Sequence, residues 1–171
     1  MNLNVLYSNV AEKDFILKVL DRNEEVFDYF FMNDENSKKI ESIKLDDNDF
    51  LLSKKIDPNI FFEKYDFFEN SIGIPIFSEK AYKIINEETE NEAIFIKCYI
   101  VNYNKTLYAL YPIKKGEIIT QRKGMNFIID ESKIDFKFCF HDLEYTTFLY
   151  TDLFLDIIKN NNLNINFRSI S

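Results

Sequence analysis

The sequence predicts an α+β fold, an antiparallel-rich sheet with a few short helices, and three observations carry this prediction. The apolar, branched and aromatic runs 93–101 and 106–113 flank a short polar segment, as the strands of a hairpin do. The run 134–140 alternates between large apolar residues and a mixed set, which predicts a strand with one face in water. Two further stretches pass directly from a strand-like run into a helix-like run.

The first 70 residues carry a weaker pattern than the rest of the chain. Residues 2–7 indicate a strand, and the apolar spacing predicts a helix over 11–20. The following run 26–31 is also compatible with a strand. Short apolar pieces surround residues 40–45, and the aromatic run 60–68 fits neither period.

The two helix starts share one chemistry. Ser78 and Thr151 are good N-cap residues, because a side-chain oxygen can accept from an otherwise unpaired backbone N–H of the first turn. Glu79 and Asp152 follow them and place negative charge at the positive end of the helix dipole. Each predicted helix carries an Ile-Ile pair on its apolar face and runs into a polar stretch that ends it. The second helix, 152–160, leads into a closing strand, INFRSI.

Length and composition predict one domain that covers residues 1–171. A chain of this size can bury roughly 68–70% of the surface that it exposes when unfolded, so it needs no metal or disulfide to fold. Its hydrophobic content of 46% and aromatic content of 16% are ample for a core and argue against disorder.

The net charge of −8 argues against a nucleic-acid partner. Neutralising phosphates requires clustered Lys and Arg, whereas the 21 basic residues here are scattered among 29 acids. An acidic surface suits a basic protein partner, whose approach it would steer, although simple solubility explains the same composition.

The N-terminal residues lack the basic and apolar regions of a secretory signal, and no apolar run approaches the ~18–20 residues that span a bilayer. We therefore expect a cytoplasmic protein with no membrane partner. The two cysteines, Cys98 and Cys139, lie in apolar strand-like runs and are expected to be reduced packing residues rather than a disulfide.

Motifs for metals, cofactors and nucleophilic catalysis are missing from the sequence. The acids from residue 46 fail the spacing of a calcium loop, the single histidine is too little for zinc, and three isolated glycines form no phosphate loop. We therefore expect no metal and no cofactor. His141 is interpreted as a turn residue. A Cys139–His141 dyad is geometrically conceivable, since a spacing of two puts both on one face of a strand.

The second half of the chain resembles a family of bacterial immunity proteins of polymorphic toxin systems, formerly catalogued as a domain of unknown function. The resemblance covers about residues 71–171 and rests on GIPIFSEKAYKII, a tyrosine-rich hairpin, FKFCF and the terminal LYTDLFLDIIKNNNLNINFRSI. Ser78-Glu79 and Thr151-Asp152 take the places of the family's two helix starts, and Phe167 lies in the closing strand. The chain departs from the family in having Asn where a terminal loop glycine is usual, and in having no Trp.

The resemblance implies a protein that is not an enzyme and that binds and neutralises a cognate protein toxin. It supplies no catalytic residues. Two alternatives stay open: a small enzyme that uses Cys139 and His141 or a carboxylate pair, or a structural adaptor. A homo-oligomer is also open. If the partner is a basic toxin, two acidic clusters expected at the surface are the candidate partner-binding residues: Asp46, Asp47, Asp49, Glu87, Glu88 and Glu90.

Overall fold

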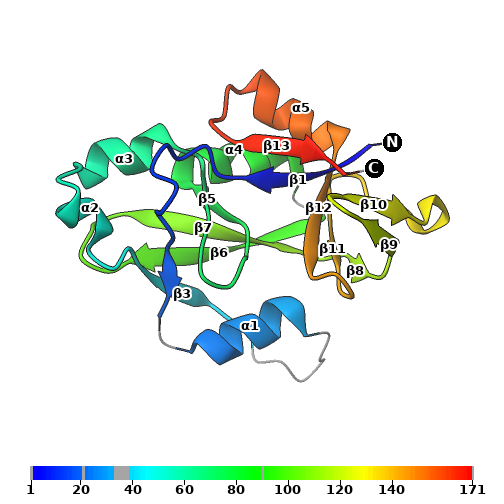
Figure 1. Cartoon of the computed structure of the whole chain (residues 1–171), viewed down its shortest axis with the longest axis horizontal. Helices are drawn as coiled ribbons and strands as arrows, with labels where there is room; N and C mark the ends of the chain where they lie inside the picture. Colours follow the sequence, from blue (N-terminus) through cyan, green and yellow to red (C-terminus); the bar gives the residue numbers. More distant parts are fainter. Residues whose placement is uncertain (1, 21, 33–38, 90, 171) are drawn as a thin grey trace.

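The chain has the α+β fold that the sequence predicts (Figure 1). The structure is a computed structural model that describes residues 2–20, 22–32, 39–89 and 91–170. A larger and a smaller sheet, both mixed and mainly antiparallel, are accompanied by a two-stranded hairpin. Helix α4 (Glu79–Thr89) packs on the larger sheet, α5 (Asp152–Asn160) packs on the smaller one, and the two helices touch.

The larger sheet has the strand order β2-β3-β6-β7-β5-β4. Strands β3 and β6 run parallel, and the other neighbours are antiparallel. The long β6–β7 hairpin forms its centre, as Figure 1 shows. The strands are β2 (Lys18–Val19), β3 (Ser42–Asp46), β4 (Phe67–Phe68), β5 (Ile76–Ser78), β6 (Ala93–Ile100) and β7 (Thr106–Pro112).

The smaller sheet has the order β13-β1-β12-β11-β8, so the first and last strands of the described chain lie side by side. Only β8 and β11 in this sheet are parallel. Its strands are β1 (Leu3–Tyr7), β8 (Lys115–Gly116), β11 (Cys139–Asp142), β12 (Thr147–Thr151) and β13 (Asn166–Ser169). The separate hairpin consists of β9 (Ile119–Lys123) and β10 (Asn126–Ile129), followed by a short 3-10 helix, Glu131–Lys133.

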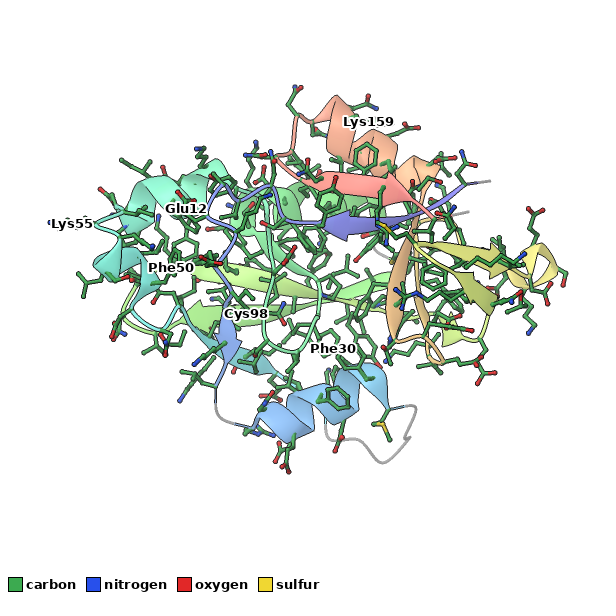
Figure 2. All side chains as sticks on the ribbon, viewed as in Figure 1. Glu12, Phe30, Phe50, Lys55, Cys98 and Lys159 are labelled. Atoms are coloured by element: carbon green, nitrogen blue, oxygen red, sulfur yellow. The ribbon has the colours of Figure 1, made fainter. Side chains whose placement is uncertain are left out.

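Three further helices cover the larger sheet: α1 (Asn23–Phe31), α2 (Phe50–Ser53) and α3 (Pro58–Lys64). Their buried apolar side chains share one core with the sheet. Figure 2 labels Phe30 of α1 and Cys98 of β6, both of which are fully buried in it. None of the helices in the described ranges combines the length and the apolar character that crossing a membrane requires.

The elements that depend on local chemistry are confirmed. The β6–β7 hairpin occupies the predicted runs, and both helix starts are capped. The Ser78 Oγ accepts from the Ala81 N–H at 3.0 Å, and the Thr151 Oγ1 accepts from the Phe154 N–H at 3.4 Å. Both cysteines are buried free thiols, as expected.

The predicted helix over 11–20 is wrong. Residues Phe15, Leu17 and Val19 are buried while Ile16 and Lys18 are exposed, which is the period of an extended chain. The backbone there pairs with its neighbours: β2 pairs with β3, and Leu17 exchanges hydrogen bonds with Glu69 and Ser71. The helix lies next along the chain, as α1, over the run that was also compatible with a strand.

The predicted strand 134–140 is only partly correct, because β11 begins at Cys139. Phe136 and Phe138 are buried and Lys137 is exposed, so buried and exposed residues alternate as predicted. Residues 134–138 nevertheless form no strand pairing. The interpretation of His141 as a turn residue is wrong, because it lies inside β11 and is completely buried.

Candidate functional site

The structure keeps the two predicted acidic clusters apart. Asp46, Asp47 and Asp49 lie where β3 connects to α2, whereas Glu87 and Glu88 lie on the last turn of α4. Strand β6 begins shortly after α4 and ends at Ile100, which pairs with Leu45. An eight-residue strand spans roughly 25 Å at about 3.3 Å per residue, so the clusters mark opposite ends of β6. Glu90 lies outside the described residues.

Asp47 is not a surface residue, because only 2% of it is exposed. Its Oδ2 accepts from the Leu51 N–H and from the Tyr103 hydroxyl, both at 3.0 Å. The expectation that the whole cluster lies at the surface is therefore wrong for Asp47, whereas Asp46 is half-buried and Asp49 is exposed.

Local sequence explains this arrangement of the 46–49 loop. Asn48 and Asp49 adopt the left-handed conformation, with φ of 55° and 57°, which Asn and Asp tolerate better than other non-glycine residues. The Asp46 carboxylate accepts from the Asn48 N–H at 3.0 Å and tightens the turn. The turn places Asp47 inside, at the start of α2, and Asp49 outside.

A cavity of about 380 Å³ opens beside this loop, and we call it the acidic pocket. The cavity lies between the extended segment after β1 and the 46–49 loop. Nothing in the sequence indicated that these two parts of the chain lie close together. Its lining residues are Asp14, Ile16, Lys18, Asp47, Asn48, Phe50 and Ser71. Asp14 is exposed at the pocket, and Ile16 and Phe50 supply apolar surface.

The raised pKa of Tyr103 indicates a negative electrostatic potential at the 46–49 loop. Its pKa is raised to about 12, first by burial and then by the hydrogen bond to Asp47 and the charges of Asp47, Asp49 and Asp46. A negative potential that disfavours the phenolate also favours an incoming cation. Lys18, at the same pocket, donates to Asn48 Oδ1 at 3.4 Å. The described residues contain no group of three or more His, Cys, Asp or Glu placed to hold a metal ion.

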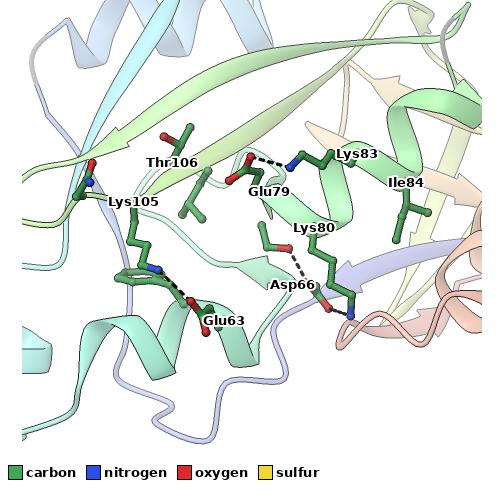
Figure 3. A pocket seen from close by; sticks show the side chains of 12 residues that line it. Glu63, Asp66, Glu79, Lys80, Lys83, Ile84, Lys105 and Thr106 are labelled. Atoms are coloured by element: carbon green, nitrogen blue, oxygen red, sulfur yellow. Dashed lines mark hydrogen bonds and ion pairs between the residues drawn. The ribbon is translucent and has the colours of Figure 1, made fainter.

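A larger cleft of about 670 Å³ lies between α3, the start of α4 and the β6–β7 loop (Figure 3). Each of its lysines pairs with an acid. Lys105 lies 3.3 Å from Glu63, Lys83 lies 2.9 Å from Glu79, and Lys80 lies 3.7 Å from Asp66, as the dashed lines in Figure 3 mark. The cleft therefore has balanced charge and offers no clear preference for a cation or an anion.

Asp66 is the buried centre of this cleft. Its Oδ1 accepts from the Ser78 hydroxyl at 2.5 Å, and its Oδ2 accepts from the Asn164 N–H at 2.7 Å. Because Ser78 also caps α4, its hydroxyl is fully engaged in holding the fold. These contacts join α3, α4 and the loop after α5, and they give Asp66 and Ser78 a structural role.

The Cys139–His141 pair lacks the geometry of a nucleophile and base. Both residues are completely buried, and burial raises the pKa of the Cys139 thiol, which favours the inert protonated form. The His141 ring stacks on Phe148 at 4.5 Å between centroids, and its two nitrogens have no hydrogen-bond partner. Burial and then the charge of Lys115 lower the pKa of His141 to about 3.

Sequence reasoning also missed Glu92, which belongs to the polar stretch after α4. Its carboxylate accepts from the Lys137, Phe138 and Cys139 N–H groups at 2.6, 2.5 and 3.3 Å. The bonds from Lys137 and Phe138 occupy the two backbone donors just before β11, so these residues cannot offer them to a neighbouring strand. No local pattern distinguishes Glu92 from its exposed neighbours, because its partners lie 45 to 47 residues away.

Comparison with known proteins adds no family to this picture: no protein-family model matches the chain, and no curated protein matches it.

Proposed function

We propose that this protein binds a cognate bacterial toxin domain in the cytoplasm and neutralises it by covering its active surface. The family resemblance of residues 71–171 suggests this role. The observation that carries the proposal is the mixture of acids and exposed apolar side chains around the acidic pocket.

Two exposed apolar side chains flank the acids of this surface. Ile16 is 48% exposed in the pocket, and Leu52 is 73% exposed on α2, three residues after Asp49. Apolar contacts supply the binding energy at the centre of an interface, and charges around them steer the partner. A basic toxin, such as one that acts on nucleic acid, would match this surface.

The net charge of −8 also favours a basic partner. Long-range attraction between an acidic protein and a basic one raises the association rate well above that of neutral partners, most strongly at low ionic strength. Neutralisation by binding requires no chemical step from this chain.

The test uses the gene adjacent to the one that encodes this chain. The toxic C-terminal domain from that gene is induced in a bacterial host with this chain, or with an empty vector. We expect growth to stop with the vector and to resume with this chain, and the purified proteins to co-elute as one complex. If both proteins accumulate and growth still stops, or if the adjacent gene encodes no toxic domain, the proposal is wrong.

A further inference from the structure

The turn of the β9–β10 hairpin is basic, although the chain as a whole is acidic. Arg122 and Lys123 are exposed just before the turn, Arg168 of β13 reaches it, and residues 118–129 contain no acid. None of these three cations forms an ion pair with a described residue. The described part of the chain therefore leaves the positive charge of the turn unpaired.

Two of these cations also fix the shape of the turn. Arg122 Nε donates to the Gly124 carbonyl at 3.0 Å, and Arg168 Nη1 donates to the Met125 carbonyl at 2.8 Å. A guanidinium group has five N–H donors, so most of them remain for a partner. Met125 is 66% exposed, and its thioether side chain packs well on aromatic rings. We call this surface, made by Arg122, Lys123, Met125 and Arg168, the basic turn.

A groove on α1 has the opposite charge and a matching apolar floor. It has a volume of about 280 Å³ and is lined by Asn23, Glu24, Phe27, Asp28 and Ile72. Phe27, which is 42% exposed, and Ile72 supply the apolar surface. Glu24 and Asp28 lie four residues apart on one face of the helix, where like charges repel, and neither forms an ion pair with a described residue. We call this surface the α1 groove.

We propose that the basic turn of one copy of this chain docks in the α1 groove of a second copy. Met125 packs on Phe27, and the cations of the turn face the two acids of the groove. Charge complementarity selects this occupant. The turn repels a basic protein such as the proposed toxin, whereas a second copy, with a net charge of −8, offers it an acidic surface. The inference goes beyond the proposed function and does not require the toxin.

The contact joins two different surfaces of the chain. Figure 1 shows the β9–β10 hairpin and α1 on different sides of the molecule, so one copy cannot close the contact on itself. Repetition of such a contact gives a ring or an open chain. At an ionic strength of about 0.15 M, repulsion between the two acidic copies is screened beyond ~8 Å, whereas charges in contact still attract. A single turn covers less than the ~1,200 Å² of a stable interface, so we expect weak association.

Sedimentation velocity of the purified chain tests this proposal, at concentrations from about 10 μM to about 1 mM. We expect the weight-average sedimentation coefficient to rise with concentration. Two double variants remove one half of the contact each. The turn variant is Lys123→Gln with Met125→Ser, and the groove variant is Glu24→Gln with Asp28→Asn. Each should weaken self-association about tenfold or more, because each removes central contacts. All four residues are exposed, so circular dichroism should stay native.

A mixture of the two variants identifies the surfaces that meet. The groove variant keeps a native basic turn, and the turn variant keeps a native α1 groove. We therefore expect the two variants, each monomeric alone, to form a 1:1 dimer when mixed, with no larger species. A mixture that stays monomeric would overturn the proposal, because it would show that the turn and the groove do not bind each other.

Control variants make the same changes of charge on exposed residues elsewhere. Lys159→Gln with Leu153→Ser on α5 matches the turn variant, and Glu88→Gln with Asp156→Asn matches the groove variant. Both controls should self-associate as the wild type does. Equal weakening by the controls, or a wild-type chain that stays monomeric over the whole concentration range, would overturn the proposal. These measurements use this chain alone, so their outcome is independent of whether the chain rescues growth from a toxin.

Discussion

The Ser78 hydroxyl donates a 2.5 Å hydrogen bond to the buried Asp66 carboxylate, twelve residues earlier in the chain, while it caps α4. Thr151 caps α5 in the same way, but its hydroxyl donates to a neutral carbonyl, that of Lys137, at 2.6 Å. The two caps therefore look alike in sequence and differ in the charge of their second partner.

This difference predicts unequal losses of stability. Ser78→Ala should cost about 2 kcal/mol, because it removes a cap and a hydrogen bond to a buried carboxylate, and Thr151→Ala about 1 kcal/mol. Urea unfolding measures both. Neither variant should lose partner binding beyond its loss of folded protein. A Thr151→Ala cost larger than that of Ser78→Ala would show that the charged partner is unimportant.

Glu92→Gln should destabilise the protein by about 2 kcal/mol, because the three N–H groups use both carboxylate oxygens and an amide offers only one, uncharged acceptor oxygen. Glu88→Gln, an exposed change on the last turn of α4, is the matched control and should lie within about 0.5 kcal/mol of wild type. Chemical denaturation of both variants checks this. Equal effects would mean that the contacts of Glu92 add nothing to stability.

The low pKa of His141, about 3, predicts a specific loss of stability in acid. Unfolded, the imidazole has an ordinary pKa near 6.5, so between pH 6.5 and 3 only the unfolded chain takes up this proton. The stability that comes from keeping the ring neutral is complete above pH 6.5 and is lost as pH falls, by up to about 1.4 kcal/mol per pH unit.

His141→Phe should remove that part of the acid sensitivity. The new ring fits the place between Phe31 and Phe148 and leaves no ring nitrogen without a partner. Unfolding measured at several pH values should give a shallower fall for the variant than for wild type below pH 6.5. Parallel curves for the two proteins would contradict the assignment of the slope to His141.

Reversing the charge of the acids that are fully or partly exposed at each end of β6 tests which end meets the partner. Asp46 and Asp49 changed together to Lys should slow association with the cognate toxin, most visibly at low salt, because charges at an interface rim act mainly on the association rate. The pair Glu87 and Glu88, changed to Lys, carries the same charge change at the other end and should have the smaller effect. Stopped-flow or surface-binding rates at two ionic strengths decide this, and unchanged rates for the first pair would remove the 46–49 loop from the interface. Asp47 is left intact in both variants, because its carboxylate holds the start of α2.

Sequence reasoning succeeded where neighbouring residues decide the structure. The caps at Ser78 and Thr151 and the β6–β7 hairpin depend on chemistry within a few residues, and a period or a capping pattern detects such chemistry. It failed over 11–20, where Phe15, Ile16 and Val19 suggest a helix but pairing with β3 holds the chain extended. Tertiary pairing overrode the local preference.

The candidate site was predicted only in part, for a related reason. Acids at 46–49 stand out in a sequence, but the burial of Asp47 depends on Tyr103, which lies 56 residues away. Asp14 reaches the same pocket from a different element. In the sequence, an Asp whose carboxylate holds a backbone turn cannot be distinguished from an Asp that faces solvent. Only the contacts in the folded protein show the difference.

The pairing of β1 with β13 has a consequence for the timing of folding. Asn4 pairs with Ser169, so the smaller sheet joins the two most widely separated strands of the described chain. At about 5–20 residues per second of synthesis, the ribosome needs roughly 8 to 33 seconds between making the first of these residues and the second. For most of that interval neither β12 nor β13 has been made, so the hydrogen-bonding groups of β1 have no partner strand. A nascent chain therefore completes this sheet only after Ser169 has been made, and until then β1 is a site at which chaperones or other nascent chains can bind.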